Sequence, residues 1–257
     1  LGDVARGGAL GFSESAIGVM LGVITPIVYA VPILSGALAE RFGYRRTLLV
    51  AFVLLATGYT IAGFVTGYGA VFGALVVMAV GAGAFKPIPS GSIARLTTEE
   101  TSGVAFGIFY WTINLGAFLF PLVFVTWLRA TFDSWTPVFL LSAAGTGLMI
   151  LPTLLLYRDP PRPENTRSLK DVLVGMVAVL KDWRFVSMIV IYSWFWILYF
   201  QMFHTVLWYL KDSVDMAPVE AAINAVGAAV GIGAQFTFEV QHVTVINALT
   251  FILLQLV

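Results

Sequence analysis

Long uninterrupted hydrophobic stretches dominate this chain, and charged residues occur almost entirely between them. Five segments contain no Asp, Glu, Lys or Arg: 15–39, 47–85, 101–128, 134–157 and 185–210. A helix of about 20 apolar residues crosses a hydrocarbon core about 30 Å thick. Four of the segments fit one helix each, whereas the longest breaks at the turn-prone residues 66–69 and holds one helix and most of another. The apolar runs do not alternate with polar residues as transmembrane strands do, so the pattern predicts spanning helices.

The pattern predicts six spanning helices and the start of a seventh. Their expected ranges are 15–38, 47–66, 70–96, 102–128, 135–157 and 185–210, followed by an apolar run at 240–257. A shorter helix is expected at 168–181, capped by Ser168. One of its faces is apolar, which favours a position on the membrane surface, and carries Leu169, Val172, Leu173, Met176 and Leu180. Five Gly-x-x-x-Gly spacings are candidates for close helix packing, at 18/22, 63/67, 69/73, 103/107 and 227/231.

The composition narrows the class of protein further. Of the 257 residues, 59% are hydrophobic and 11% are charged, against about 25% charged in soluble domains. So few charges cannot make a water-facing surface, which excludes a soluble enzyme, a disordered tail and a nucleic-acid binder. The formal net charge is zero and there is no Cys, so the sequence offers neither disulfides nor thiolate metal sites. We expect an all-α polytopic membrane protein with no metal and no cofactor.

The loops carry an asymmetric distribution of positive charge. If each predicted span from residue 15 onward crosses the membrane once, successive loops lie on opposite sides. The loops on one side then hold only three basic residues, Arg6, Arg129 and Lys211. The loops on the opposite side hold ten basic residues: Arg41, Arg45, Arg46, Arg95, Arg158, Arg162, Arg167, Lys170, Lys181 and Arg184. The positive-inside rule therefore predicts that loops 40–46, 97–101 and 158–184 are cytoplasmic, in a multi-pass protein of the inner or plasma membrane.

The first of these loops carries a recognisable motif. Residues 36–46 read Gly-Ala-Leu-Ala-Glu-Arg-Phe-Gly-Tyr-Arg-Arg. This resembles the Gly-x-x-x-Asp-Arg-x-Gly-x-Arg-Arg motif between the second and third helices of the major facilitator superfamily, with Glu in place of Asp. The resemblance implies a gating motif whose charges pair across the two halves of a transporter, made of Gly36, Glu40, Arg41, Gly43, Arg45 and Arg46. The alternative interpretation is an ordinary basic cytoplasmic loop.

The resemblance also assigns the helices. If the motif follows helix 2, the chain is a fragment of a 12-helix transporter that covers about helices 2–8, and helix 1 lies before Leu1. The expected domains are then an N-terminal helical bundle at 1–157 (helices 2–6), a cytoplasmic linker with its amphipathic helix at 158–184, and the start of the C-terminal bundle at 185–257 (helix 7 and the beginning of helix 8).

Two further segments resemble the proton-dependent oligopeptide transporters. Residues 81–90 read Gly-Ala-Gly-Ala-Phe-Lys-Pro-Ile-Pro-Ser, similar to that family's Gly-x-Gly-x-x-Lys-Pro-Asn. Residues 106–117 read Phe-Gly-Ile-Phe-Tyr-Trp-Thr-Ile-Asn-Leu-Gly-Ala, similar to its Phe-x-x-Phe-Tyr-x-x-Ile-Asn-x-Gly-Ala. The resemblance implies proton-coupled symport of di- and tripeptides or similar small solutes by alternating access. It implies a peptide or small-molecule substrate, protons and the lipid bilayer as partners, and no nucleic acid.

Lys86 carries the sharpest physical signal. It lies nine residues before Arg95, or about 13 Å from the cytoplasmic end of its helix. A cation at mid-membrane costs about 2.5–3.5 kcal/mol, so such residues face cavities or partners. The predicted spanning helices contain no Asp or Glu to pair with it. The resemblance places it in the central cavity as a substrate-binding and proton-coupling residue; the alternative is a structural pair with an acid on another helix. Pro87 and Pro89 predict a kink here.

Three further residues are candidates for substrate binding and one for proton coupling. The resemblance implies substrate contacts for Asn114, Tyr29 and Gln201, although a lone Asn in a span also serves as a link between helices and Tyr29 could be bulk alone. Phe200 stands where the resembled family has a carboxylate. His204, one turn further on, titrates near physiological pH and is a coupling candidate, or a buried neutral His with a local hydrogen bond.

Two other functions stay open. A transporter of another small anion or drug would use Lys86 as an anion clamp. A non-transporting scaffold or an intramembrane enzyme is the alternative from another class. An enzyme needs paired acids, a His cluster or a nucleophile with its base, and this sequence contains none, so we expect no enzyme activity.

Overall fold

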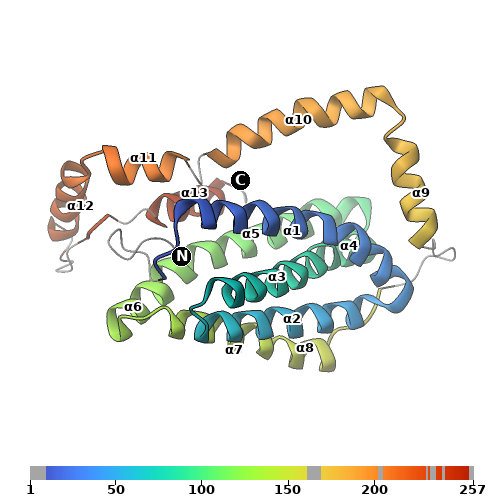
Figure 1. Ribbon diagram of the computed structural model, residues 1–257, viewed down its shortest axis with the longest axis horizontal. Coiled ribbons are helices and arrows are strands. Elements are labelled where there is room, and N and C mark those ends of the chain that lie inside the picture. The colour runs from blue at the N-terminus through green and yellow to red at the C-terminus, as the bar shows by residue number, and fades with distance from the viewer. Residues whose placement is uncertain are drawn as a thin grey trace. The chain divides into compact units, whose positions relative to one another are not determined.

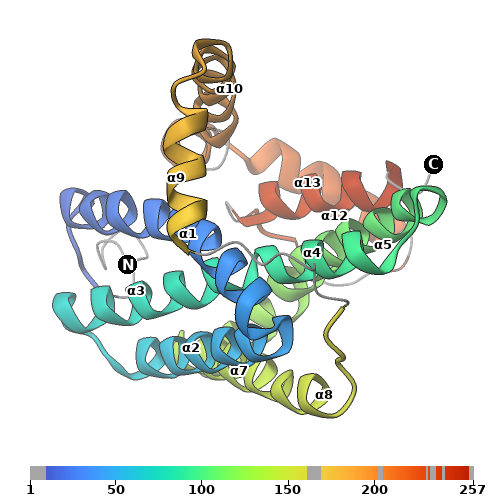
Figure 2. The same ribbon diagram turned by 90° about the vertical axis from the view of Figure 1, so that its right-hand side faces the viewer.

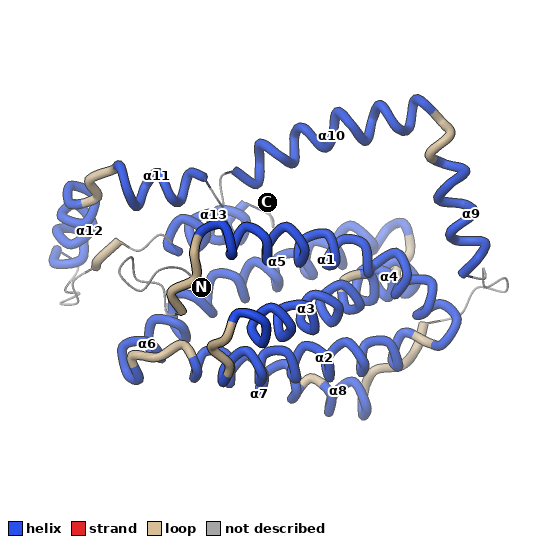
Figure 3. Tube along the Cα trace, viewed as in Figure 1, coloured by secondary structure: helices blue, strands red, loops and turns tan. Residues whose placement is uncertain are grey.

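The structure, a computed structural model, describes residues 10–160, 169–201, 205–229, 231, 236–238 and 241–254. All regular secondary structure in these residues is helical (Figure 3). Six of the described helices, some of them interrupted, are long and apolar enough to span a membrane: Glu14–Phe42, Tyr44–Phe64, Tyr68–Leu96, Glu99–Phe132, Thr136–Leu155 and Trp183–Leu207. This confirms the all-α polytopic class and the six spans predicted from the charge gaps.

The helices follow one another with short connections. In chain order they are α1 (Glu14–Phe42), α2 (Tyr44–Phe64), α3 (Tyr68–Phe85), α4 (Pro87–Leu96), α5 (Glu99–Leu119), the π-helix η2 (Phe120–Val125), α6 (Thr126–Phe132), α7 (Thr136–Leu148), α8 (Ile150–Leu155), α9 (Leu169–Val179), α10 (Trp183–Gln201), α11 (Thr205–Ser213), α12 (Ala217–Ala229) and α13 (Gln241–Leu254).

The chain forms two compact units. The first contains residues 1–106 and 125–175, and the second contains residues 107–124 and 176–257. In the first unit α3 lies between α1 and α2, and α2 lies between α3 and α7 (Figures 1 and 2). The predicted division of the chain into two halves joined by residues 158–184 stays a prediction.

The core of the first unit lies where α1 ends and α2 begins. Buried side chains from α1, α2 and α4 meet there, with α3 and α8 packed against them. They are Ala39, Tyr44, Leu48, Phe52 and Ile88, covered by Phe85, Ile150 and Tyr157. Gly43 makes the turn between α1 and α2, because its φ of 103° is one that residues with a Cβ rarely adopt.

Prolines interrupt two of the spans. Lys86 separates α3 from α4, and Pro87 is the first residue of α4, which is the kink predicted from the sequence. In the span Glu99–Phe132 the residues around Pro121 form a π-helix. Proline has no N–H to donate, and a wider turn is one way in which a helix accommodates that loss.

The second unit contains a helix with an aromatic face and a helix that holds an extended segment. Along α10, the rings of Tyr192, Phe195, Trp196, Tyr199 and Phe200 stack or meet edge to face. In α12, the side-chain amide of Asn224 donates to the Phe236 carbonyl and accepts from its N–H. The Glu220 carboxylate accepts from the Phe238 N–H, so α12 binds the backbone just before α13.

The short helix predicted at 168–181 is present as α9, from Leu169 to Val179. Its predicted capping residue, Ser168, lies outside the described residues. The position of this helix on a membrane surface stays a prediction.

Candidate functional site

Lys86 lies against the aromatic ring of Tyr29. The Lys86 Nζ is 3.9 Å from the ring centroid, which is a cation–π contact. The two residues come from different helices, Lys86 from the α3–α4 break and Tyr29 from the middle of α1. Within the part of the chain that the structure describes, no carboxylate forms a salt bridge with Lys86. Tyr29 is 52% exposed and Lys86 is also exposed, so a further group can reach the ammonium from outside.

A hydrogen bond between α1 and α3 fixes this pair in place. Gly83 lies four residues before Pro87, and proline has no N–H to donate to the Gly83 carbonyl. The buried Ser35 hydroxyl donates to that carbonyl oxygen instead, over 3.3 Å. The break at Lys86 therefore leaves a backbone acceptor that a side chain of α1 satisfies.

The same glycine lets the two helices approach closely. A Cβ at Gly83 would lie 2.7 Å from the Cβ of Val31 and 3.3 Å from the Cδ of Pro32. Any side chain there would push α1 away from α3, three residues before Lys86. Gly83 and Ser35 therefore both hold α1 close to α3 near the Tyr29–Lys86 pair.

The other predicted substrate-binding residues belong to the second unit. Asn114 lies in α5, is half-buried, and donates from Nδ2 to the Tyr110 carbonyl of its own helix at 2.9 Å. Gln201 ends α10 and its Oε1 accepts a hydrogen bond from the Thr205 hydroxyl. His204, the coupling candidate, lies outside the described residues. The substrate-binding and coupling roles of these three residues stay predictions.

The motif at 36–46 is built around an ion pair inside the first unit. The Glu40 carboxylate accepts a hydrogen bond from the Arg95 guanidinium at 2.9 Å, which joins the end of α1 to the end of α4. The Arg95 Cζ lies 5.3 Å from the ring centroid of Tyr44, which is buried. Gly36 also lies on this side of α1, since a Cβ there would be 3.8 Å from Pro87.

Arg45 is held by the end of α8. Its backbone N–H donates to Asp159 Oδ1 at 2.6 Å. Its Nε donates to the Thr153 carbonyl at 3.1 Å, and its Nη2 donates to the Leu154 carbonyl. The guanidinium therefore lies at the last turn of α8, and the backbone N–H lies at the first turn of α2.

Arg41 and Arg46 point away from these contacts. Both are exposed, and the Arg41 Cζ lies 5.5 Å from the ring of its neighbour Phe42. Among the described residues, Arg46 makes no side-chain hydrogen bond and no ion pair. The basic residues of the motif therefore divide into one inward side chain, Arg45, and two outward ones.

A hydroxyl pair lies beside the motif. Ser92 donates its only hydroxyl proton to the Ile88 carbonyl at 2.7 Å, so the Tyr157 hydroxyl must donate to Ser92 Oγ, 2.5 Å away. Burial raises the pKa of Tyr157 above its ordinary value, and the negative charge of Asp159 adds to the rise. Tyr157 therefore keeps its proton at neutral pH and stays a donor.

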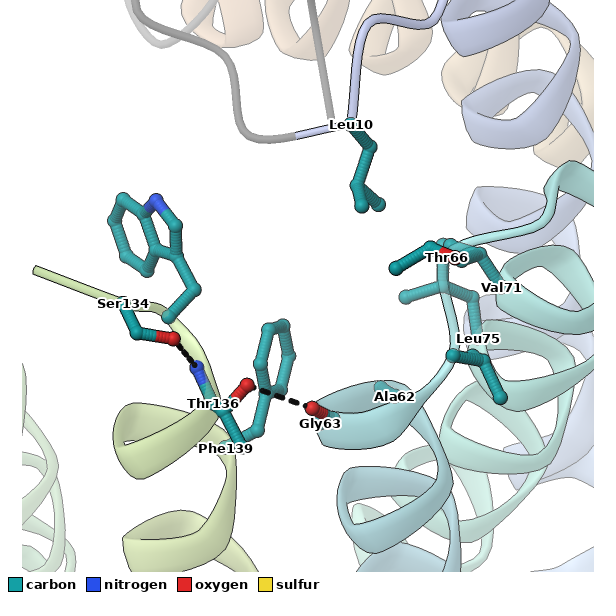
Figure 4. Close-up of a pocket in the computed structure, with 11 residues that line it drawn as sticks. Leu10, Ala62, Gly63, Thr66, Val71, Leu75, Ser134, Thr136 and Phe139 are labelled. Carbon is teal, nitrogen blue, oxygen red and sulfur yellow. Dashed lines mark hydrogen bonds between the residues drawn. The ribbon is translucent and has the colours of Figure 1, made fainter.

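A cavity of about 410 Å³ opens at the other end of the first unit, away from Lys86 and the motif. Its lining comes from the end of α2, the start of α3 and the start of α7 (Figure 4). Most of the lining is apolar, as at Phe139, Val71 and Leu75. The Thr136 hydroxyl donates to the Gly63 carbonyl at 2.9 Å and joins α7 to α2 at its rim.

Sequence reasoning missed Ser35, Tyr157 and Asp159. Ser35 is a small polar residue in an apolar helix. The sequence hints at its role only through Pro87, four residues after Gly83 in another helix, which leaves the Gly83 carbonyl without a backbone donor. Asp159 reads as an ordinary loop acid. Their partners lie 48 and 114 residues away along the chain, so no local pattern connects them.

Comparison with known proteins agrees with this architecture. The family profile described as the Major Facilitator Superfamily matches residues 5–254. The dipeptide and tripeptide permease A of Escherichia coli (strain K12) is 27% identical over 184 residues, which are 66% of this chain and 36% of the permease. The permease A of Proteus mirabilis (strain HI4320) is 31% identical over 183 residues, which are 66% of this chain and 37% of that protein. The chain thus spans about a third of the length of the curated relatives it matches.

Solved structures share the fold. A POT family transporter in complex with 5-aminolevulinic acid superposes with a TM-score of 0.55 at 23% identity, covering 88% of this chain and 45% of the other. A mutant of the peptide transporter POT in complex with alafosfalin superposes with a TM-score of 0.61 at 21% identity, covering 98% of this chain and 60% of the other. The multi-pass arrangement in the cell membrane agrees with these relatives. The chain belongs to the Major Facilitator Superfamily, and its resemblance to the peptide transporters of that superfamily is confirmed.

Proposed function

We propose that the protein to which this chain belongs is a secondary transporter that couples proton entry to the uptake of di- and tripeptides or similar small solutes. The observation that carries the proposal is the Lys86–Tyr29 pair, an ammonium in a membrane-spanning segment held on an aromatic ring. A peptide has a carboxylate at one end, which an ammonium without a described carboxylate partner attracts. The relatives named as dipeptide and tripeptide permeases support this substrate class.

Substrate would bind near the membrane midplane and be exposed alternately to each side. In this proposal Lys86 binds the carboxylate end, while Tyr29, Asn114 and Gln201 contact the rest of the substrate. Proton coupling would involve Lys86 and His204, with the bilayer and protons as the further partners. The motif residues Arg41 and Arg46 would contact the second half and bias the gate. The protein is then a transporter and not an enzyme.

The test is uptake by the full-length protein in proteoliposomes with an inward proton gradient. Lys86→Ala should abolish accumulation of a radiolabelled dipeptide while the protein still folds and inserts. Lys86→Arg should not rescue it fully, because a planar guanidinium differs from an ammonium point charge. Lys170→Ala, which removes an exposed lysine of α9, is the matched control and should transport normally. Wild-type accumulation by Lys86→Ala would leave Lys86 as a structural cation and overturn the proposal.

A specific observation favours a second candidate, a superfamily transporter for another small anion. Phe200, in the aromatic face of α10, stands where peptide transporters carry an acid. If the substrate is a peptide, Phe200→Glu should leave peptide uptake unchanged or raise it. If wild type accumulates a small organic anion but no peptide, and Lys86→Ala loses that anion uptake, the anion transporter is the correct function. His204→Gln tests the coupling role: a pH profile of uptake equal to that of wild type would make His204 structural.

A further inference from the structure

Arg45 and Asp159 connect the start of α2 to the end of α8. Asp159 accepts a backbone N–H of α2, and the Arg45 side chain donates to backbone carbonyls of α8. Helix α2 starts after Gly43, which has no side chain to cap the exposed N–H groups of the first turn. Asp159 Oδ1 accepts the Arg45 N–H at 2.6 Å, so the cap of α2 comes from 114 residues away. A carboxylate at a helix N-terminus also interacts favourably with the helix dipole.

The Arg45 side chain does the reverse for α8. Its Nε and Nη2 donate to the carbonyls of Thr153 and Leu154 in the last turn of that helix. The carbonyls in the last turn of a helix have no backbone N–H from a following turn to bind them. A cation near them also interacts favourably with the negative end of the helix dipole. The planar guanidinium supplies two diverging donors, which an ammonium on a lysine cannot place in the same way.

Tyr157 adds a third connection from the same segment. Its hydroxyl donates to Ser92 Oγ, which is buried in α4. Within two residues of one another, Tyr157 and Asp159 therefore bind two different helices, α4 and α2. Glu40 and Arg95 form a separate ion pair on the α1 side.

We propose that Arg45, Asp159 and Tyr157 form a clasp that fastens the chain leaving α8 to the first turn of α2 and to α4. The clasp changes the role expected for the motif. Arg45 holds the first unit together, and the contact across the two halves falls to Arg41 and Arg46. The chain that leaves α8 is then fastened to the first unit as far as Asp159.

The first test compares variants of Asp159 in the full-length protein. Asp159→Ala removes the acceptor, whereas Asp159→Asn keeps an oxygen at the same place, and Asn is as good a cap as Asp. We expect Asp159→Ala to lower Tm by about 2–4 °C, as loss of a helix cap does, and Asp159→Asn to stay near wild type. Hydrogen–deuterium exchange should rise in Asp159→Ala at peptides covering 44–50 and 153–159.

The second test is a double-mutant cycle. Arg45→Ala should give the same exchange pattern and a similar loss of Tm, and the double variant Arg45→Ala/Asp159→Ala should lose less than the sum. Arg158→Ala, which removes an exposed arginine between Tyr157 and Asp159, is the control and should leave Tm and exchange unchanged. Where Arg45→Ala does not fold, Arg45→Lys serves in the same cycle.

The clasp is overturned if Asp159→Ala and Asp159→Asn behave alike, if the two alanine substitutions are additive, or if Arg158→Ala produces the same exchange pattern. Loss of uptake by Arg45→Ala with wild-type exchange and Tm would assign Arg45 to gating instead. Because Tm and exchange do not depend on substrate, the clasp and the proposed transport function can fail separately.

Discussion

The hydroxyl of Ser35 in α1 donates a hydrogen bond across 3.3 Å to the carbonyl oxygen of Gly83 in α3. That carbonyl lies four residues before Pro87, which has no N–H to donate. The bond therefore satisfies the carbonyl that is left without a donor at the α3–α4 break, where the Lys86 side chain lies against Tyr29. The candidate site depends on this joint between two helices as well as on the residues that would touch a substrate.

Ser35→Ala should destabilise the protein by about 1–2 kcal/mol, because the buried Gly83 carbonyl loses the donor that replaces the missing N–H. Ser142→Ala is the matched control. The Ser142 hydroxyl donates to the Val138 carbonyl of its own helix, which already has a backbone partner available. Thermal unfolding of the purified full-length protein measures both, and equal losses of Tm would contradict the role assigned to Ser35.

Gly83→Ala should disturb the contact between α1 and α3. The new Cβ would lie 2.7 Å from the Val31 Cβ, so the two helices must separate, at a cost of about 1–3 kcal/mol. Gly73→Ala, on the same helix with open space around it, should be neutral or slightly stabilising. The Tm values of Gly83→Ala and Gly73→Ala, each measured against wild type, test this difference. Because Lys86 lies three residues on, we also expect Gly83→Ala to raise the KM for substrate. A Tm equal to that of Gly73→Ala would show that the helices do not pack this closely.

Tyr29→Phe keeps an aromatic ring beneath the Lys86 ammonium, whereas Tyr29→Leu removes it. A cation–π contact contributes about 0.5–2 kcal/mol, so loss of the ring should weaken substrate affinity by about 2- to 30-fold. Competition of peptides against a labelled dipeptide measures the affinity of each variant. If Tyr29→Leu binds as tightly as wild type, the ring does not position Lys86; if Tyr29→Phe is impaired as much as Tyr29→Leu, the Tyr29 hydroxyl is the group that matters.

The sidedness of the loops can be tested in intact cells with single introduced cysteines, since this chain contains none. Gly67 and Glu99 are both exposed: Gly67 directly precedes α3, and Glu99 is the first residue of α5, just after α4 ends. An impermeant thiol reagent should label Gly67→Cys in intact cells, and Glu99→Cys only after the membrane is permeabilised. The opposite pattern would reverse the orientation deduced from the Lys/Arg distribution.

Much of the fold was predictable because membrane insertion selects for local properties. A span needs about 20 apolar residues and excludes charge, and both requirements can be read along the chain without knowledge of any contact. The expected range 47–66 became α2, and the kink expected at Pro87 separates α3 from α4. The π-helix at 120–125 and helix α12 were not predicted, because each depends on local backbone geometry that hydrophobicity alone does not specify.

Glycine spacing identified few of the packing contacts. Among the predicted Gly-x-x-x-Gly pairs, a Cβ added at Gly63 would lie 3.3 Å from the Cβ of Phe139, while Gly18, Gly22, Gly69 and Gly73 have open space. The tightest approaches occur at other glycines, where a Cβ at Gly58 would overlap the Met78 Cγ and a Cβ at Gly83 would lie 2.7 Å from the Val31 Cβ. Which face of a helix meets a neighbour depends on the neighbour's position, and spacing within one helix does not contain that information.

The sequence by itself determined the helices, the class of membrane protein, and the presence of a lysine and a basic motif that need partners, because hydrophobicity and charge act residue by residue. Only the tertiary structure decided which partners they have. It placed Tyr29 beneath Lys86, gave Ser35 the carbonyl that Pro87 leaves unsatisfied, and turned Arg45 inward onto α8 while Arg41 stays outward. These choices join residues 48 to 114 positions apart, and those of Ser35 and Arg45 satisfy backbone groups that a proline or a helix end leaves without a partner.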